Sequence, residues 1–95
     1  MQSKSGEWVI LEDNLRIPSG ASYPMIARSV MRKVLPEIFH DQKIVDNRNY
    51  GDILKSMMDY VNVNGGLNVI FTPGRYNSAY FEHSYLAEKS QATLA

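Results

Sequence analysis

The stretch NVNGGLNVIFTPGRYNSAYF, from Asn62 to Phe81, decides the fold because it joins a helical part of the chain to a part that favours strands. Leu67 to Phe71 is rich in strand-forming residues, and Tyr76 to Phe81 can form a second strand. Between them, TPGR at 72–75 matches a type II turn, whose third position needs the positive φ that glycine adopts readily. The stretch therefore predicts a C-terminal β-hairpin.

The first of two predicted amphipathic helices begins near Ser22, a candidate N-cap, and ends near Leu35. Pro36 would stop this helix and can itself begin a short helical turn that extends to Asp41. On a period of 3.6 residues the apolar side chains of the helix form one stripe. The stripe contains Tyr23, Ile26, Ala27, Val30, Met31, Val34 and Leu35. Met25 falls off this stripe and is expected to be exposed.

The second helix follows Asn49, also a candidate N-cap, and ends before the glycine pair Gly65-Gly66. Its apolar face contains Tyr50, Ile53, Leu54, Met57, Met58 and Val61, with Tyr60 at the margin. Beyond the hairpin, residues 83–95 are predicted to continue as a short helix that frays at its end. Before the first helix, residues 8–17 favour a short strand or hairpin that is closed by Pro18 and Gly20.

These elements predict a small α+β fold with two main helices and a short helical turn packed on a small antiparallel sheet. Three helical segments followed by a hairpin is the element order of a winged helix. We expect one domain at residues 7–90, between a disordered tail at 1–6 and a frayed end at 91–95. The predicted core consists of Trp8, Ile10, Ile26, Val30, Val34, Phe39, Ile53, Leu54, Met57, Val61, Val69 and Phe71.

Composition excludes several classes of protein. The 95 residues contain no cysteine, so a disulfide framework and a thiolate metal site are excluded. Ten basic residues balance ten acidic ones, which argues against a strongly basic nucleic-acid binder or an acidic tail. No apolar run approaches the roughly 20 residues of a membrane span, and the first residues lack the apolar centre of a signal peptide. A protein of the cytoplasm or nucleus is expected.

The middle of the chain is nevertheless mildly basic, and this favours a first functional hypothesis, a small DNA-binding regulator. Arg28 and Arg32 are four residues apart and project from one side of the first helix, where they could contact phosphates. The full set of candidate nucleic-acid contacts is Arg28, Arg32, Lys33, Arg48, Asn49 and Arg75. The second helix argues against groove reading, because Asp52 and Asp59 outnumber its one lysine, Lys55. An ordinary solvated face remains the alternative interpretation.

A second hypothesis is a protein-interaction module or inhibitor. Aromatic side chains near the predicted hairpin could anchor a partner, and zero net charge suits such an interface. The candidate residues are Tyr76, Tyr80, Tyr85 and Met25. Packing of the same rings in the core is the competing interpretation. An exposed edge strand would also allow a homodimer.

Catalysis finds little support in the sequence. His40-Asp41 and Glu82-His83 are acid–histidine neighbours, but a catalytic or metal role would need each pair to meet a third group in space. The chain lacks a nucleophile elbow, an HExxH motif and a glycine-rich phosphate loop. We therefore expect a protein that is not an enzyme and that has no cofactor and no metal.

Overall fold

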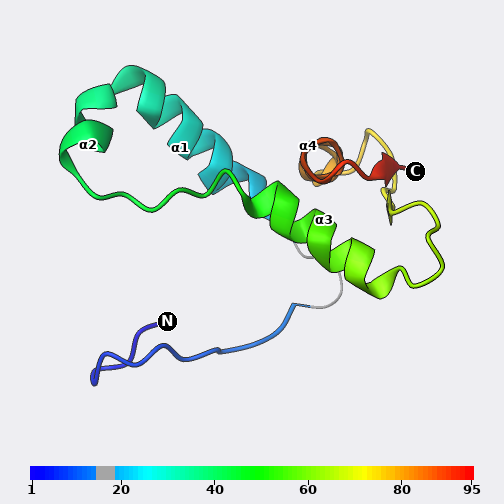
Figure 1. Ribbon diagram of the computed structural model, residues 1–95, viewed down its shortest axis with the longest axis horizontal. Helices are drawn as coiled ribbons and strands as arrows, with labels where there is room; N and C mark the ends of the chain where they lie inside the picture. Colours follow the sequence, from blue (N-terminus) through cyan, green and yellow to red (C-terminus); the bar gives the residue numbers. More distant parts are fainter. Residues whose placement is uncertain (15–18) are drawn as a thin grey trace.

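The computed structural model describes residues 1–14 and 19–95 (Figure 1). These residues form a small α+β arrangement of four helices and a two-stranded sheet. In chain order the elements are α1 (Ser22–Val34), α2 (Pro36–Asp41), α3 (Tyr50–Val61), β1 (Val69–Ile70), α4 (Tyr80–Ser90) and β2 (Thr93–Leu94). The predicted extents of the first three helical segments are confirmed, since Pro36 separates α1 from α2 and the apolar residues of α1 and α3 recur at helical spacing.

The sheet is parallel, so the predicted antiparallel hairpin and the winged-helix order that depended on it are not found. Val69 pairs with Thr93 and Ile70 with Leu94, and α4 lies between the two strands in sequence. This is a βαβ unit, in which a helix provides the crossover that parallel strands require. The Thr72 N–H donates to the Ala95 carbonyl at 2.8 Å and extends the pairing beyond the strands.

The second predicted strand is instead the entry to α4. The Asn77 side-chain oxygen accepts the Ala79 N–H at 2.9 Å, and this local bond turns the chain into a helix that begins at Tyr80. A period-two pattern over six residues does not exclude a helix, and the predicted strand at 76–81 is therefore wrong. Gly74 does adopt the positive φ that the predicted turn requires, at +97°.

Few side chains are buried among the described residues. Met25 and Ala87 are the buried hydrophobic side chains, and they lie beside four buried polar or charged residues. The four are Ser22, Glu82, His83 and Ser90. Most of the predicted core is exposed, because α1 and α3 each pack on α4 with only part of their apolar stripe. The exposed members are Trp8, Ile10, Val30, Val34, Ile53, Met57, Val61, Val69 and Phe71.

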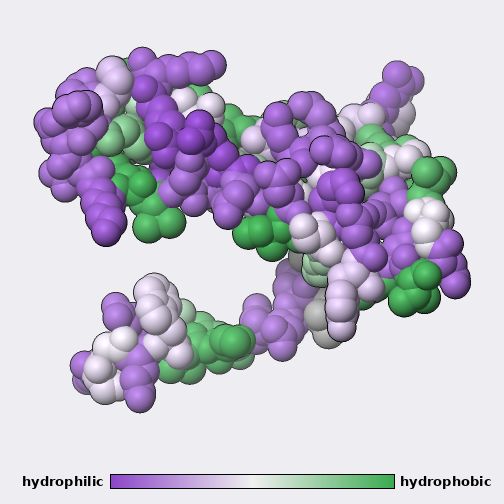
Figure 2. Space-filling view, viewed as in Figure 1, coloured by the Kyte–Doolittle hydropathy of each residue, from purple (hydrophilic) through white to green (hydrophobic). Residues whose placement is uncertain are grey.

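Hydrophobic side chains consequently reach the surface in several separate places (Figure 2). One run follows the N-terminal segment, which extends away from the helices. There the Val9 N–H donates to the Met1 carbonyl at 2.9 Å and closes a small hairpin. The predicted pattern at 15–18 lies outside the described residues. Within the described residues, no helix combines the length and the apolar character that crossing a membrane requires.

Candidate functional site

A polar cluster occupies the place where α1 begins against α4. Glu82 is only 1% exposed, and its carboxylate accepts the Ser22 N–H at 3.1 and 3.2 Å. The Ser22 hydroxyl also donates to this carboxylate. Glu82 therefore satisfies the first turn of α1, where positive partial charge favours an anion. The predicted N-cap at Ser22 is wrong, because the residue is the first of α1 and its hydroxyl donates to α4.

His83 connects the same helix to the loop after β1. Its Nδ1 lies 3.0 Å from the Thr72 hydroxyl, which also accepts the Gly74 N–H at 3.3 Å. The acid–histidine neighbours Glu82 and His83 thus bond to different segments and do not bond to each other. The arrangement joins the first residue of α1 and the loop after β1 to α4, which is a structural role.

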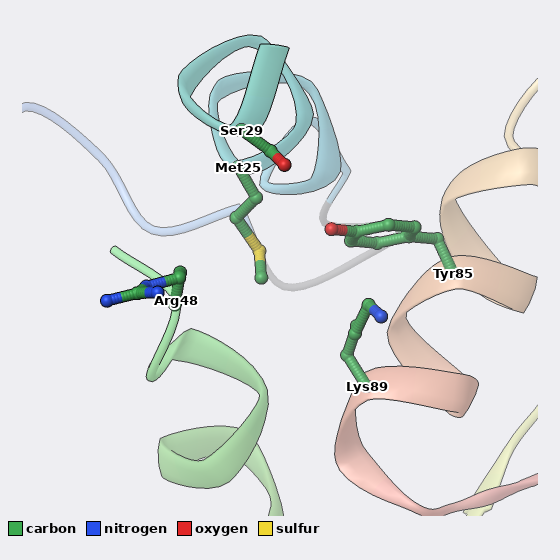
Figure 3. Close-up of a pocket in the computed structure, with 5 residues that line it drawn as sticks. All are labelled: Met25, Ser29, Arg48, Tyr85 and Lys89. Atoms are coloured by element: carbon green, nitrogen blue, oxygen red, sulfur yellow. The ribbon is translucent and has the colours of Figure 1, made fainter. Parts of the chain in front are cut away.

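A pocket of about 270 Å³ opens between α1 and α4, further along the two helices than the contact of Ser22 with Glu82 (Figure 3). Met25 and Ser29 reach it from α1, and Tyr85 and Lys89 reach it from α4. Arg48 stands at its rim, on the loop just before α3. Met25 is 7% exposed, so the expectation that it would be exposed is wrong. The pocket therefore presents two hydroxyls and an ammonium group above an apolar floor.

The charges around the pocket are partly compensated. Arg48 Nε donates to Asp46 at 2.7 Å, and its guanidinium is turned away from the pocket (Figure 3). This hydrogen bond, followed by the bond from the Arg48 backbone N–H, lowers the pKa of Asp46 to about 2. Lys89 bonds to Glu88 at 3.1 Å, which raises the pKa of the lysine. Lys89 also lies over the Tyr85 ring, with Nζ 5.5 Å from its centroid.

The arginines of the predicted basic face contact other segments of the chain. Arg28 donates to the Val45 carbonyl at 2.7 Å, and Arg32 lies 3.6 Å from Asp46. Both guanidinium groups also stack over the Phe39 ring, at 5.9 and 4.6 Å from its centroid. These arginines thus tie α2 and the loop before α3 to α1. Their spacing on one side of the helix was predicted correctly, but their partners were not.

The remaining predicted contacts are dispersed. Lys33 is exposed on α1. Asn49 is the N-cap residue of α3, as predicted, although its side chain makes no capping hydrogen bond. Arg75 stacks with Tyr76 at 5.2 Å in the turn before α4, and Tyr76 is 91% exposed. The other residues of the aromatic hypothesis, Tyr80, Tyr85 and Met25, lie on α4 and α1. Of the predicted site residues, Met25, Tyr85 and Arg48 meet at the pocket, whereas Arg28 and Arg32 meet over the Phe39 ring.

Comparison with known proteins identifies the family. Residues 1–95 match the family described as circularly permuted ATP-grasp type 2, and the chain belongs to this family. The prediction of a DNA-binding regulator is therefore wrong, and so is the hairpin-borne interaction module, since the hairpin does not form. The physical basis of the DNA-binding prediction also fails, because Arg28, Arg32 and Arg48 already have partners within the chain.

Several relatives are much longer than this chain. An uncharacterised protein of Synechocystis is 40% identical over 93 residues, which are 95% of this chain and 19% of the relative. An uncharacterised protein of Mycobacterium tuberculosis is 41% identical over 92 residues, 94% of this chain and 17% of the relative. A protein of Frankia casuarinae, provisionally named glutamate–cysteine ligase 2-2, is 36% identical over 93 residues, 94% of this chain and 11% of the relative.

These relatives oppose the expectation of a non-enzymatic protein, since the family is named for ATP-grasp and one relative for a ligase. Sequence reasoning missed Ser29 and Lys89 of the pocket and the partnership of Ser22 with Glu82. A helix predicted from Tyr80 would have placed Tyr85 and Lys89 four residues apart on one face. The signal for that helix was Asn77-Ser78, which are residue types that commonly precede a helix.

Proposed function

We propose that this chain is one portion of an ATP-dependent ligase that joins a carboxylate to an amine. The observation that carries the proposal is the match of all 95 residues to the ATP-grasp family. The Frankia relative adds the substrate class, because a glutamate–cysteine ligase by its name joins two amino acids. The chain spans 11–19% of the relatives described above, so the remaining polypeptide would supply most of the active site.

The pocket between α1 and α4 supports a role in holding an anionic group. ATP and amino acids both carry anionic oxygens, which an ammonium group and hydroxyls can bind with charge-assisted hydrogen bonds. Lys89 supplies the ammonium, and Ser29 and Tyr85 supply the hydroxyls. The Tyr85 hydroxyl points toward α1 across the opening (Figure 3).

The size of the pocket sets what it can hold. Its volume of about 270 Å³ lies just below the roughly 300–1,000 Å³ of small-molecule sites. It fits a phosphate or a carboxylate with part of its carrier and does not enclose a nucleotide. Within residues 1–14 and 19–95, no three histidine, cysteine or acidic side chains gather to hold a metal ion.

The test is a chimera in which this chain replaces the matching 93 residues of the Synechocystis protein. We expect ATP consumption that depends on a carboxylate and an amine substrate, measured as ADP or AMP release with the ligated product identified by mass spectrometry. A folded chimera, and a folded parent, that consume no ATP with any pair of amino acids would overturn the ligase assignment.

Lys89→Met tests the pocket within that chimera. The substitution keeps the length of the side chain and removes its charge, so we expect kcat/KM to fall about tenfold or more, as for loss of one charge-assisted contact. Lys33→Met is the matched control, because Lys33 is exposed on α1 outside the pocket. Equal activity of the two variants would show that the pocket does not contact substrate.

A further inference from the structure

The helix α3 presents two different apolar surfaces. Gly51, Leu54 and Met58 recur at helical spacing and are buried or half-buried on the side that packs on α4. A second row of side chains lies next to them around the helix and remains exposed. We call this row the open stripe, and it consists of Tyr50, Ile53, Met57, Tyr60 and Val61.

The open stripe is more exposed than an ordinary helix margin. Its side chains range from 42% exposed at Tyr50 to 86% exposed at Tyr60. A fully exposed aromatic ring alone offers roughly 150–250 Å² of surface, so five such residues present several hundred Å². Contiguous apolar patches of this size mark an interaction surface.

We propose that the open stripe docks against an apolar surface of the remaining polypeptide of an ATP-grasp protein. The relatives described above extend far beyond the matched residues, which make up 19% of the Synechocystis protein and 11% of the Frankia protein. Most of their polypeptide is therefore available to cover this helix. The proposal rests on family membership and does not depend on the ligase activity.

The area of the stripe favours this occupant over a second copy of the chain. A stable interface between separate proteins buries about 800 Å² on each partner, which exceeds the several hundred Å² that α3 offers. A segment of the same polypeptide needs less area, because its high effective concentration offsets the entropy of association. The docked surface should also lack charge at its centre, since all five side chains of the stripe are uncharged.

The polar side of α3 lies outside the proposed docking contact of the open stripe. Lys55 pairs with Asp59 at 2.5 Å, and the Asn68 amide donates to Asp59 at 2.6 Å. These bonds hold the polar groups away from the stripe and attach the loop after α3 to the helix. Ser56 is exposed among these polar residues, and its hydroxyl donates to the Asp52 carbonyl at 2.8 Å. Ser56 therefore provides a reference position on the same helix.

The absence of cysteine allows thiol labelling to test the proposal. Met57→Cys places a thiol in the open stripe, and Ser56→Cys places one on the polar side. Each variant is labelled as the free chain and within the chimera, and mass spectrometry reports the rate at that peptide. We expect labelling of Met57→Cys to slow about tenfold or more in the chimera, as for a group that reacts only after local opening. Ser56→Cys should react rapidly in both.

Equal rates for Met57→Cys in the free chain and the chimera would overturn the proposal. Slow labelling in the free chain, together with a dimeric mass by light scattering, would also overturn it, because a second copy would then cover the stripe. If the chimera does not fold, hydrogen exchange of the matching helix in the intact Synechocystis protein and in its isolated segment gives the same comparison. A loss of activity with retained protection would contradict the proposed function alone.

Discussion

At the scale of single residues, the structure shows charged groups that serve positions far away in the sequence. Glu82 completes the start of α1 from sixty residues later, and its burial is tolerated because the Ser22 N–H and hydroxyl both donate to it. Asp46, in contrast to the buried Glu82, is exposed, and it forms ion pairs with both Arg48 and Arg32. Sequence spacing identifies such side chains as charged but does not give their partners.

The titration of Asp46 gives a prediction at this scale. Its pKa of about 2 lies below the ordinary 3.8, so its ion pairs contribute stability above pH 3.8 that is lost as pH falls through about 2. Arg48→Ala removes the largest cause, and we expect the pKa of Asp46 to rise toward 3.8. An NMR titration of the side-chain carboxyl measures this pKa directly. Lys33→Ala should leave the titration midpoint unchanged, and an unchanged midpoint in Arg48→Ala would contradict the assigned ion pair.

At the scale of elements, the contact between α3 and α4 depends on one glycine. Gly51 is buried, and a Cβ atom at this position would lie 2.5 Å from the Lys89 carbonyl oxygen. Because that atom belongs to the backbone of α4, it cannot move aside without displacing the helix. The close approach also sets the position of Lys89 at the pocket.

Gly51→Ala should therefore separate α3 from α4. We expect a loss of about 1–3 kcal/mol in the free energy of unfolding, the cost of overpacking, measured by urea denaturation. Gly66→Ala is the matched control, since its nearest neighbour, the Asn62 side-chain oxygen, would lie at an ordinary 3.8 Å. Equal stability of the two variants would show that the helices do not approach so closely.

The elements also show which parts of the fold the sequence could predict. The limits of α1, α2 and α3 followed from local residues, such as Pro36 and the apolar periodicity. The parallel pairing of β1 with β2 could not be predicted in this way, because Val69 and Thr93 lie far apart and their contact depends on the crossover helix. The pocket was missed for the same reason, since Lys89 reaches it only when residues 80–90 are helical.

At the scale of the whole molecule, the chain is more extended than a compact domain. Its radius of gyration is 16.2 Å, whereas about 12 Å is expected for 95 residues. The predicted core failed at this scale, because hydrophobic periodicity identifies an apolar face and does not say which molecule or segment covers it. Ile53, Met57 and Val61 belong to such a face and are exposed.

The free chain should accordingly have low stability and bind a hydrophobic dye. We expect a free energy of unfolding below the roughly 5 kcal/mol typical of domains and a shallow urea transition, since little surface is buried. Fluorescence of the dye ANS should fall when the same residues are placed in the chimera. A sharp transition with no dye binding would mean that the free chain closes over its apolar side chains.

The βαβ connection has a consequence for the order in which the chain forms during synthesis. Thr93 is synthesised 24 residues after its partner Val69. The strand β1 therefore remains unpaired while α4 emerges from the ribosome. At about 5–20 residues per second, that interval is roughly one to five seconds. During it, the exposed Val69 and Phe71 are available to other nascent segments. Because synthesis sets this interval, rapid formation of α4 cannot shorten it, and β1 gains its partner only after the whole crossover helix has been made.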